Sequence, residues 1–314
     1  MNLITQEHSN WSSHSLSIEI CRKFVRDNVL VLSETWVNAN HHQIQQYAIL
    51  IRNWLNKSPE NKAISVSFYD QGLVRKKIHM FDVDVSRIRF IDQHDICFWL
   101  LVVDKYFLKY ANEDLIPVRF NHKFLCYQRK ITTHRRKLYD TLKDKEGIVT
   151  LGDQKFEIND MIPVHVGLKE AHIRLEMPND IYSLGNPDIW NTAFLNIVSE
   201  TNQDFKDGCA FISEKTFKPI IGLRPFICFA NPNISKQLKE LGFETFDDDF
   251  DYRPTDDEET NITMISDIIQ NIDFNRLNND KLYDTYLPKL LHNKNWLPKA
   301  AEKQWKKIEE LANE

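Results

Sequence analysis

The strongest constraint on the fold of this chain is its repeated alternation of short apolar runs with helix-type segments. NVLVLS at 28–33, AISVSFYD at 63–70 and RIRFID at 87–92 are rich in β-branched and aromatic residues, as strands are. Between the first two, residues 41–57 place apolar side chains three and four apart, which is typical of one face of a helix. Strands separated by helices favour parallel pairing, because a parallel strand needs a long crossover connection.

The same alternation recurs in the second half of the chain. Further strands are expected at 122–128, 147–152, 193–201, 224–230 and 243–246. Helices are expected at 96–111, 133–145, 213–222, 234–242, 257–271 and from about 281 to 314. Thr133 is expected to cap its helix, and Gly242 to end the helix before it.

The sequence therefore predicts an α/β protein with two domains that each contain a parallel sheet. A chain of 314 residues is long enough for two cores of ordinary size. We expect an α/β domain at 1–119, a second one at 120–280, and a helical tail at 281–314 that packs back on the first.

Composition narrows the class of protein. The net charge of −5 excludes a general basic field that would hold nucleic acid or anionic lipid. Five cysteines without CxxC spacing indicate reduced thiols, and the longest apolar run, 96–103, is too short to cross a bilayer. The N-terminal residues do not have the pattern of a signal peptide, so we expect a soluble, cytoplasmic protein without a membrane span.

Polar residues follow the expected strands where a ligand site is expected. In open parallel sheets, ligands bind at the carboxyl ends of the strands. One strand ends at Gln128–Arg129, another at Glu200–Thr201, and a helix begins at Ser213–Lys215. A helix N-terminus favours a phosphate, and an anion there would offset the unfavourable placement of Lys215 against the helix dipole. The alternative is that Glu214 and Lys215 form a surface ion pair worth less than about 1 kcal/mol.

Glycine-rich phosphate loops are absent from the sequence. The chain has eight glycines, and none forms a GxGxxG or Walker-type pattern. A phosphate must therefore be bound by something other than a glycine cradle.

Three stretches resemble a known enzyme family. VSET, FISEKTFKPI and RPFICFANPNISKQLKELGFETFD are similar to the donor-binding half of GT-B glycosyltransferases of the α1,3-fucosyltransferase type, and to related short viral and bacterial (phage) proteins. KFLCYQRKITTHRRKL is similar to the stretch where an Arg follows the first strand of their nucleotide domain. The resemblance covers roughly residues 120–255 and is most specific at Ser213–Lys215. For a viral protein, the expected compartment is the host cytoplasm.

The resemblance implies a GT-B fold, with two Rossmann-like domains, a cleft between them and a C-terminal helix that crosses back. It implies that Glu214 holds the ribose of a nucleotide-sugar, that Lys215 and Arg129 hold its pyrophosphate, and that Glu200 lines the sugar pocket. The implied donor-binding set is Arg129, Glu200, Thr201, Ser213, Glu214, Lys215 and Thr216. This chain departs from the family pattern at Thr201, where Asn and Ser are usual, and Phe211 is its one aromatic residue shortly before the Ser-Glu-Lys.

The implied activity is an inverting, metal-independent hexosyl- or pentosyltransferase. It would move a sugar from a nucleoside-diphosphate sugar to a hydroxyl of a glycan or of a modified DNA base. Cationic side chains would stabilise the leaving diphosphate, so no metal cofactor is expected. The general base would come from the first domain, where Glu34, Asp70 and Asp92 are the candidates in that order. Each of these carboxylates also suits a turn or a helix cap.

Two alternatives remain open at this point. Asp82–Val83–Asp84 is a DxD pattern, in which two carboxylates share a divalent metal in another glycosyltransferase fold. The chain can also be a non-catalytic module that binds a nucleotide-sugar without consuming it. The acidic balance disfavours a DNA acceptor, although the basic residues at 129–137 offer a local patch.

Overall fold

The computed structural model describes residues 3–5, 13–33, 41–67, 71–106, 119–128, 131–152, 184, 187–200, 210–279 and 281–314. These residues divide into two compact units. The described residues of unit 1 lie within Met1–Val102 and Glu302–Glu314, and those of unit 2 lie between Val103 and Ala301. The chain passes from unit 1 to unit 2 between Val102 and Val103, inside the helix Phe98–Tyr106. The sequence places the boundary later, between residues 119 and 120.

Unit 1 contains a parallel sheet of four strands among its described residues. The strands follow in the order β1 (Leu3–Thr5), β2 (Val29–Ser33), β3 (Lys62–Val66) and β4 (Ile88–Ile91). The three strands expected in this region are therefore present and parallel. The sequence did not indicate β1, because three residues are too few for a periodic pattern.

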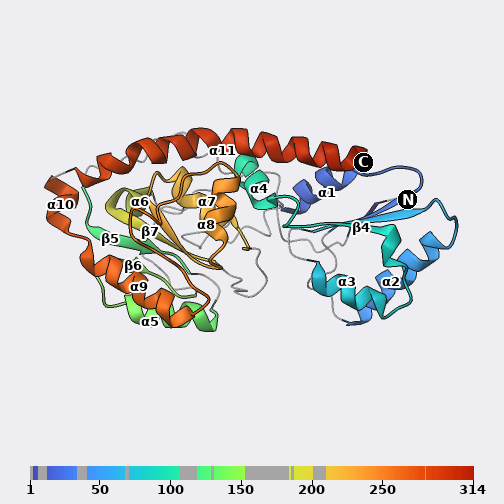
Figure 1. Ribbon diagram of the computed structural model, residues 1–314, viewed down its shortest axis with the longest axis horizontal. Coiled ribbons are helices and arrows are strands. Elements are labelled where there is room, and N and C mark those ends of the chain that lie inside the picture. Colours follow the sequence, from blue (N-terminus) through green and yellow to red (C-terminus); the bar gives the residue numbers. More distant parts are fainter. Residues whose placement is uncertain are drawn as a thin grey trace. The chain divides into compact units, whose positions relative to one another are not determined.

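One face of the unit 1 sheet packs against helices α2 and α3. The helices and turns of this unit are α1 (Ser13–Lys23), α2 (His41–Leu55), α3 (Gly72–His79), the 3-10 turn η1 (Val85–Arg87) and α4 (Phe98–Tyr106). Leu30, Leu32 and Ala63 of the sheet are buried against Ile51 and Leu55 of α2. The expected apolar face of α2 is thereby confirmed at these two positions. Figure 1 shows α1 on the other side of the sheet from α2 and α3.

Unit 2 contains a second parallel sheet, and its strand order creates a switch point. The order is β6 (Ile148–Val149), β5 (His122–Cys126), β7 (Ala193–Ser199), β8 (Phe226–Phe229). From β5 the chain moves outward to β6, and from β7 it moves outward in the opposite direction to β8. In open α/β sheets, the crevice at the carboxyl ends of two such neighbouring strands is where ligands bind.

Helices cover both faces of the unit 2 sheet. They are α5 (Thr133–Leu142), α6 (Pro187–Thr192), α7 (Glu214–Ile221), α8 (Ile234–Glu240), α9 (Glu258–Asn271), α10 (Phe274–Asn279) and α11 (Leu282–Asn313). In Figure 1, α5 and α9 lie side by side on one face, and α7 and α8 lie toward the other. Both units are therefore α/β with parallel strands, as the sequence predicts.

Gly242 follows α8 as expected, in a conformation that favours glycine. Its φ is +91°, in the left-handed region. A Cβ at this position would lie 2.4 Å from Nε1 of Trp296, so a larger residue would force the indole away.

Two local predictions are wrong. Residues 243–246 form no strand, because a side chain from α11 takes the backbone groups that a neighbouring strand would pair. The N–H of Glu244 donates to Oδ1 of Asn293, and Nδ2 of Asn293 donates back to the carbonyl of Glu244, both at 2.8 Å. Thr133 is the first residue inside α5, and the N-cap position is occupied by Thr132, whose side chain makes no capping bond.

The last residues of α11 pack within unit 1. The guanidinium of Arg89 donates to the carbonyl of Leu311 at 2.9 Å and pairs with the carboxylate of Glu314 at 2.5 Å. The N–H of Cys97 donates to the side-chain oxygen of Gln304 at 3.0 Å.

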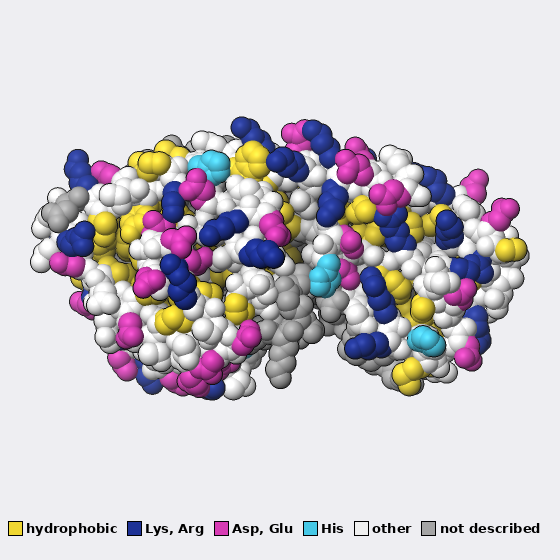
Figure 2. All heavy atoms as spheres, in the orientation of Figure 1, with side chains coloured by type: hydrophobic (Ala, Val, Ile, Leu, Met, Phe, Trp, Pro, Cys, Tyr) yellow, Lys and Arg dark blue, Asp and Glu magenta, His cyan; other side chains and the backbone are white. Residues whose placement is uncertain are grey.

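The described surface carries charges of both signs. Figure 2 shows lysine and arginine side chains interspersed with aspartate and glutamate side chains over the drawn face of each unit. In the part of the chain that the structure describes, no helix is both long and apolar enough to cross a membrane.

Candidate functional site at the end of the unit 2 sheet

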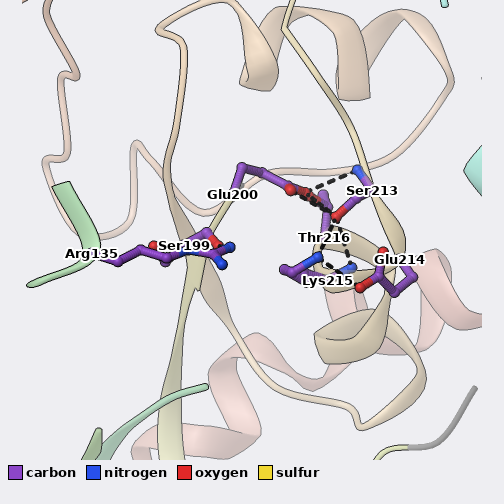
Figure 3. Close-up of polar contacts among 7 residues, drawn as sticks. All are labelled: Arg135, Ser199, Glu200, Ser213, Glu214, Lys215 and Thr216. Atoms are coloured by element: carbon purple, nitrogen blue, oxygen red, sulfur yellow. Dashed lines mark hydrogen bonds and ion pairs between the residues drawn. The ribbon is translucent and has the colours of Figure 1, made fainter. Parts of the chain in front are cut away.

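Glu200 is fully buried directly after β7 and is bonded to the start of α7. Its carboxylate accepts hydrogen bonds from the N–H of Ser213 at 2.9 Å, from the Ser213 hydroxyl at 2.6 and 2.9 Å, and from the Thr216 hydroxyl at 2.7 Å. Figure 3 shows this side chain pointing at Ser213. Both carboxylate oxygens of Glu200 therefore fix α7 at the carboxyl end of the strand. The sugar-pocket role expected for Glu200 stays a prediction.

Ser213 caps α7 and completes the link between strand and helix. Its backbone is extended, and its side-chain oxygen accepts from the N–H of Lys215 at 3.3 Å. The hydroxyl thus accepts from the helix while it donates to Glu200. The helix start expected at Ser213 is confirmed. Ser213 is the N-cap, and serine suits this position because its hydroxyl accepts a backbone N–H of the first turn.

Glu214 and Lys215 form an ion pair that is largely withdrawn from water. Nζ of Lys215 lies 2.7 Å from Oε1 of Glu214 and 3.2 Å from the hydroxyl of Ser213. The side chain of Glu214 is 4% exposed and that of Lys215 is 21% exposed, so the interpretation as a solvated surface pair is wrong. Burial acts to raise the pKa of Glu214, but the charges of Lys215 and Lys218 and the hydrogen bond outweigh it, and the pKa is lowered.

Lys215 is the point at which α7 reaches solvent. All the other residues of the helix are buried: Glu214, Thr216, Phe217, Lys218, Pro219, Ile220 and Ile221. An amphipathic surface helix would expose a whole stripe of side chains. The exposure of α7 is instead concentrated at one cation in its first turn.

The start of α5 is bonded to the same end of β7. The guanidinium of Arg135, which is fully buried, donates to the carbonyl of Ser199. Nε2 of His134 lies 3.2 Å from the carbonyl of Glu200, and burial lowers the pKa of this histidine. Figure 3 shows the Arg135 side chain reaching Ser199 from the side opposite Lys215. Two cations from two helices thus flank the carboxyl end of β7.

Arg135 is a site residue that sequence reasoning missed. It was grouped with the exposed basic residues at 129–137, although Arg135, Leu138 and Leu142 share one helical face and are the buried residues of α5. The available signal was the spacing of Arg135 to the two leucines, which follow it by three and seven residues, on the same face of a helix.

Gln128 and Ser199 are buried polar residues at the switch point. Within the described residues, the side-chain amide of Gln128 makes no hydrogen bond of normal geometry, and neither does the hydroxyl of Ser199. The thiol of Cys126, a weak donor, lies near the amide. The backbone of Gln128 is fixed by Thr150, whose hydroxyl accepts its N–H at 2.8 Å, and by the N–H of Gly152, which donates to its carbonyl at 2.9 Å.

The structure brings together five of the expected donor-binding residues: Glu200, Ser213, Glu214, Lys215 and Thr216. Four other expected residues, Glu34, Asp70, Arg129 and Thr201, lie outside the described part of the chain.

Asp92 holds a turn after β4. It is 2% exposed, and its two carboxylate oxygens accept the N–H groups of Gln71 at 3.1 Å and of His94 at 3.0 Å. Both carboxylate oxygens are thus used by backbone donors near the turn. This geometry supports the turn interpretation of Asp92.

The DxD pattern also serves the backbone. Asp84 is the N-cap of η1, and its carboxylate accepts from the N–H of Ser86 at 3.1 Å and from its hydroxyl at 2.6 Å. Asp82 has a φ of +55°, as a turn residue. Among the described residues, no group of three or more His, Cys, Asp or Glu side chains is arranged to hold a metal ion.

No family model, curated protein or solved structure matches the chain. Its function must therefore be inferred from the site itself, since an α/β fold hosts many activities.

Proposed function

We propose that the chain is a metal-independent GT-B glycosyltransferase and that unit 2 binds its nucleoside-diphosphate sugar. The observation that carries the proposal is the start of α7, where Lys215 alone keeps solvent exposure beside an anchored helix N-terminus. The anchor is Glu200, and it sits at the topological switch point of a parallel sheet.

A diphosphate suits this arrangement for electrostatic reasons. The positive end of the α7 dipole and the ammonium of Lys215 would both favour the same anion. Arg135, on the other side of the β7 end, adds a second positive charge. Because charge develops on the diphosphate as the sugar leaves, fixed cations stabilise the transition state and replace a metal ion.

Glu214 and unit 1 supply the remaining parts of the proposal. The lowered pKa of Glu214 keeps it ionised at neutral pH, so its carboxylate can accept hydrogen bonds from ribose hydroxyls. The parallel α/β sheets of both units are compatible with a GT-B enzyme. The oxygens of Asp92 are engaged by backbone donors, which leaves Glu34 and Asp70 as the better candidates for the general base.

A glycan fits as the acceptor better than DNA. The net charge is −5, and over the described residues of the face in Figure 2 basic side chains are broken up by acidic ones. DNA binding depends on clustered cations that neutralise phosphates. The proposed acceptor is thus a glycan hydroxyl, with a modified DNA base as the second candidate.

The test is a thermal-shift screen with GDP-, UDP-, ADP-, CMP- and dTDP-sugars, each with and without EDTA. We expect one nucleotide family to stabilise the wild type, by about 2.7 kcal/mol at a hundredfold excess over its Kd. Stabilisation should survive EDTA and disappear in Lys215→Ala. Lys236→Ala is the matched control, because Lys236 is an exposed lysine on a neighbouring helix of the same unit.

Two results would change the conclusion. If no nucleotide-sugar stabilises the wild type, or if Lys215→Ala responds like Lys236→Ala, the donor site is not at α7. If a donor binds but is never consumed with any glycan or DNA acceptor, the chain is a binding module rather than a transferase.

A further inference from the structure

Two buried polar side chains without hydrogen bonds of normal geometry among the described residues lie at the switch point, where the donor site is proposed. Gln128 is 0% and Ser199 is 1% exposed, and among the described residues the polar atoms of both side chains make no hydrogen bond of normal geometry. The Gln128 amide contacts the thiol of Cys126, which is a weak hydrogen-bonding partner. Buried polar groups in native proteins are nearly always paired, and each exception calls for a physical reason.

The two side chains come from adjacent strands at the same level. Strands β5 and β7 pair with Leu125 opposite Asn196. Continued past the strand ends, this register places Gln128 beside Ser199. Both residues therefore stand at the carboxyl end of the sheet.

The chemistry of the pair matches hydroxyl groups. The Gln128 amide offers both donors and acceptors, and the Ser199 hydroxyl offers one donor and two lone pairs. A phosphate would leave the amide oxygen against another acceptor, and a cation would leave the amide nitrogen against positive charge. A sugar hydroxyl both donates and accepts, so a diol can satisfy all of these groups at once.

We propose that Gln128 and Ser199 form a specificity subsite that reads sugar hydroxyls of the donor, on either the ribose or the transferred sugar. This inference rests on the proposed function, and it names the part of the ligand that the site would discriminate. A site that hydrogen-bonds a substrate hydroxyl rejects an analogue lacking it strongly, because buried groups of the protein are then left unpaired. In the unliganded chain, the same groups are kept at the expense of stability.

The test is Gln128→Met, which keeps the length of the side chain and removes its polar atoms. We expect the Tm of the unliganded variant to lie between that of the wild type and a value about 2 °C higher. We expect its affinity for the nucleotide-sugar found in the screen, measured by calorimetry, to fall roughly tenfold or more. Ser199→Ala should change both quantities in the same directions by smaller amounts.

Ser17→Ala is the matched control. Ser17 is also fully buried with an unpartnered hydroxyl, but it belongs to α1 of unit 1. Its replacement removes the same kind of unpaired group, and we expect no change in affinity for any nucleotide.

The ligand arms separate the two sources of hydroxyls. If Gln128→Met lowers the affinity for the nucleoside diphosphate and for the nucleotide-sugar equally, Gln128 binds the ribose. If it lowers the affinity for the nucleotide-sugar alone, Gln128 binds the transferred sugar. Unchanged affinity for both, or a fall in affinity accompanied by a lower Tm, overturns the subsite. If the wild type binds neither compound, the proposed function itself fails.

Discussion

A buried glutamine lies near the carboxyl end of each sheet. The side-chain amide of the first is hydrogen-bonded to neighbouring strands and, within the described residues, that of the second is not. In unit 1, Nε2 of Gln71 donates to the carbonyls of Ser65 at 3.1 Å and Ile91 at 2.9 Å, and Oε1 accepts from the Ser65 hydroxyl at 2.5 Å. In unit 2, the Gln128 amide makes no such bonds within the described residues. The first amide joins two strand ends, whereas the second keeps its bonding capacity.

The carboxylates at the carboxyl ends of the two sheets also differ in what they hold. After β4, the carboxylate of Asp92 is used by backbone N–H groups of its own turn. After β7, Glu200 is likewise used, but it positions Lys215, whose side chain still reaches solvent. A polar strand end alone therefore does not indicate a binding site. A site is better marked by polar groups that the fold leaves unused.

Replacing Gln71 is expected to have the largest effect. Gln71→Met removes three hydrogen bonds and leaves the two carbonyls and one hydroxyl buried, which should lower the free energy of unfolding by about 3 kcal/mol. Gln128→Met is the matched partner and should not destabilise the protein. Urea denaturation measures both, and equal losses for the two variants would abolish the contrast between the sheet ends.

Glu200→Gln is expected to cost somewhat less. An amide NH₂ would face donors in place of one carboxylate oxygen, so the bonds to Ser213 and Thr216 cannot all be kept. We expect the free energy of unfolding to fall by about 2 kcal/mol. Glu240→Gln, on the exposed part of α8, serves as the control and should be nearly neutral. A neutral result for Glu200→Gln would mean that its charge does not hold α7.

Glu214 should make stability depend on pH in the acid range. Its folded pKa is lowered below the unfolded value, so the ionised form favours folding above about pH 4.3 and this contribution is lost as the pH falls through the folded pKa. Because Lys215 still reaches solvent, Glu214→Gln should be less stable than the wild type by about 1 kcal/mol at pH 7. The two should converge only as the pH falls below that lowered folded pKa. A constant difference across this range would show that packing rather than charge matters at this position.

The DxD segment should show the smallest effect. Asp84→Ala removes the cap of one exposed turn and should lower the Tm by about 1 or 2 °C. Because Asp84 is used as a cap, Mn²⁺ should raise the Tm of the wild type no more than that of the variant. A metal-dependent rise that Asp84→Ala abolishes would restore the metal-binding interpretation.

Much of the fold could be predicted because its signals are local. Strands β2 to β5, β7 and β8 coincide with apolar runs, and helices α5, α7, α8, α9 and α11 coincide with periodic or capped segments. The strand expected at 243–246 failed for a nonlocal reason, since Asn293 on α11 supplies its hydrogen bonds. No pattern within the segment itself contains that information.

The candidate site could be predicted in part. The residue types at Ser213–Lys215 already indicated a helix start with an anion preference, because capping depends on adjacent residues. The bond from Glu200 to that helix start required the fold. The lack of normal hydrogen bonds at the Gln128 amide among the described residues also required it, because a single sequence shows which polar groups exist but not which of them find partners.

Helix α11 has a consequence for the order in which the protein is completed during synthesis. Its last residues, Glu302–Glu314, belong to unit 1, while the preceding residues belong to unit 2. Ile308 there is fully buried, and Leu311 and Glu314 hold the guanidinium of Arg89. A ribosome therefore makes most of unit 1 first but delivers its final segment last, after all of unit 2. An N-terminal fragment that stops at Val102 lacks part of its own core, so the two units should be separated by supplying residues 302–314 in trans rather than by a single cut.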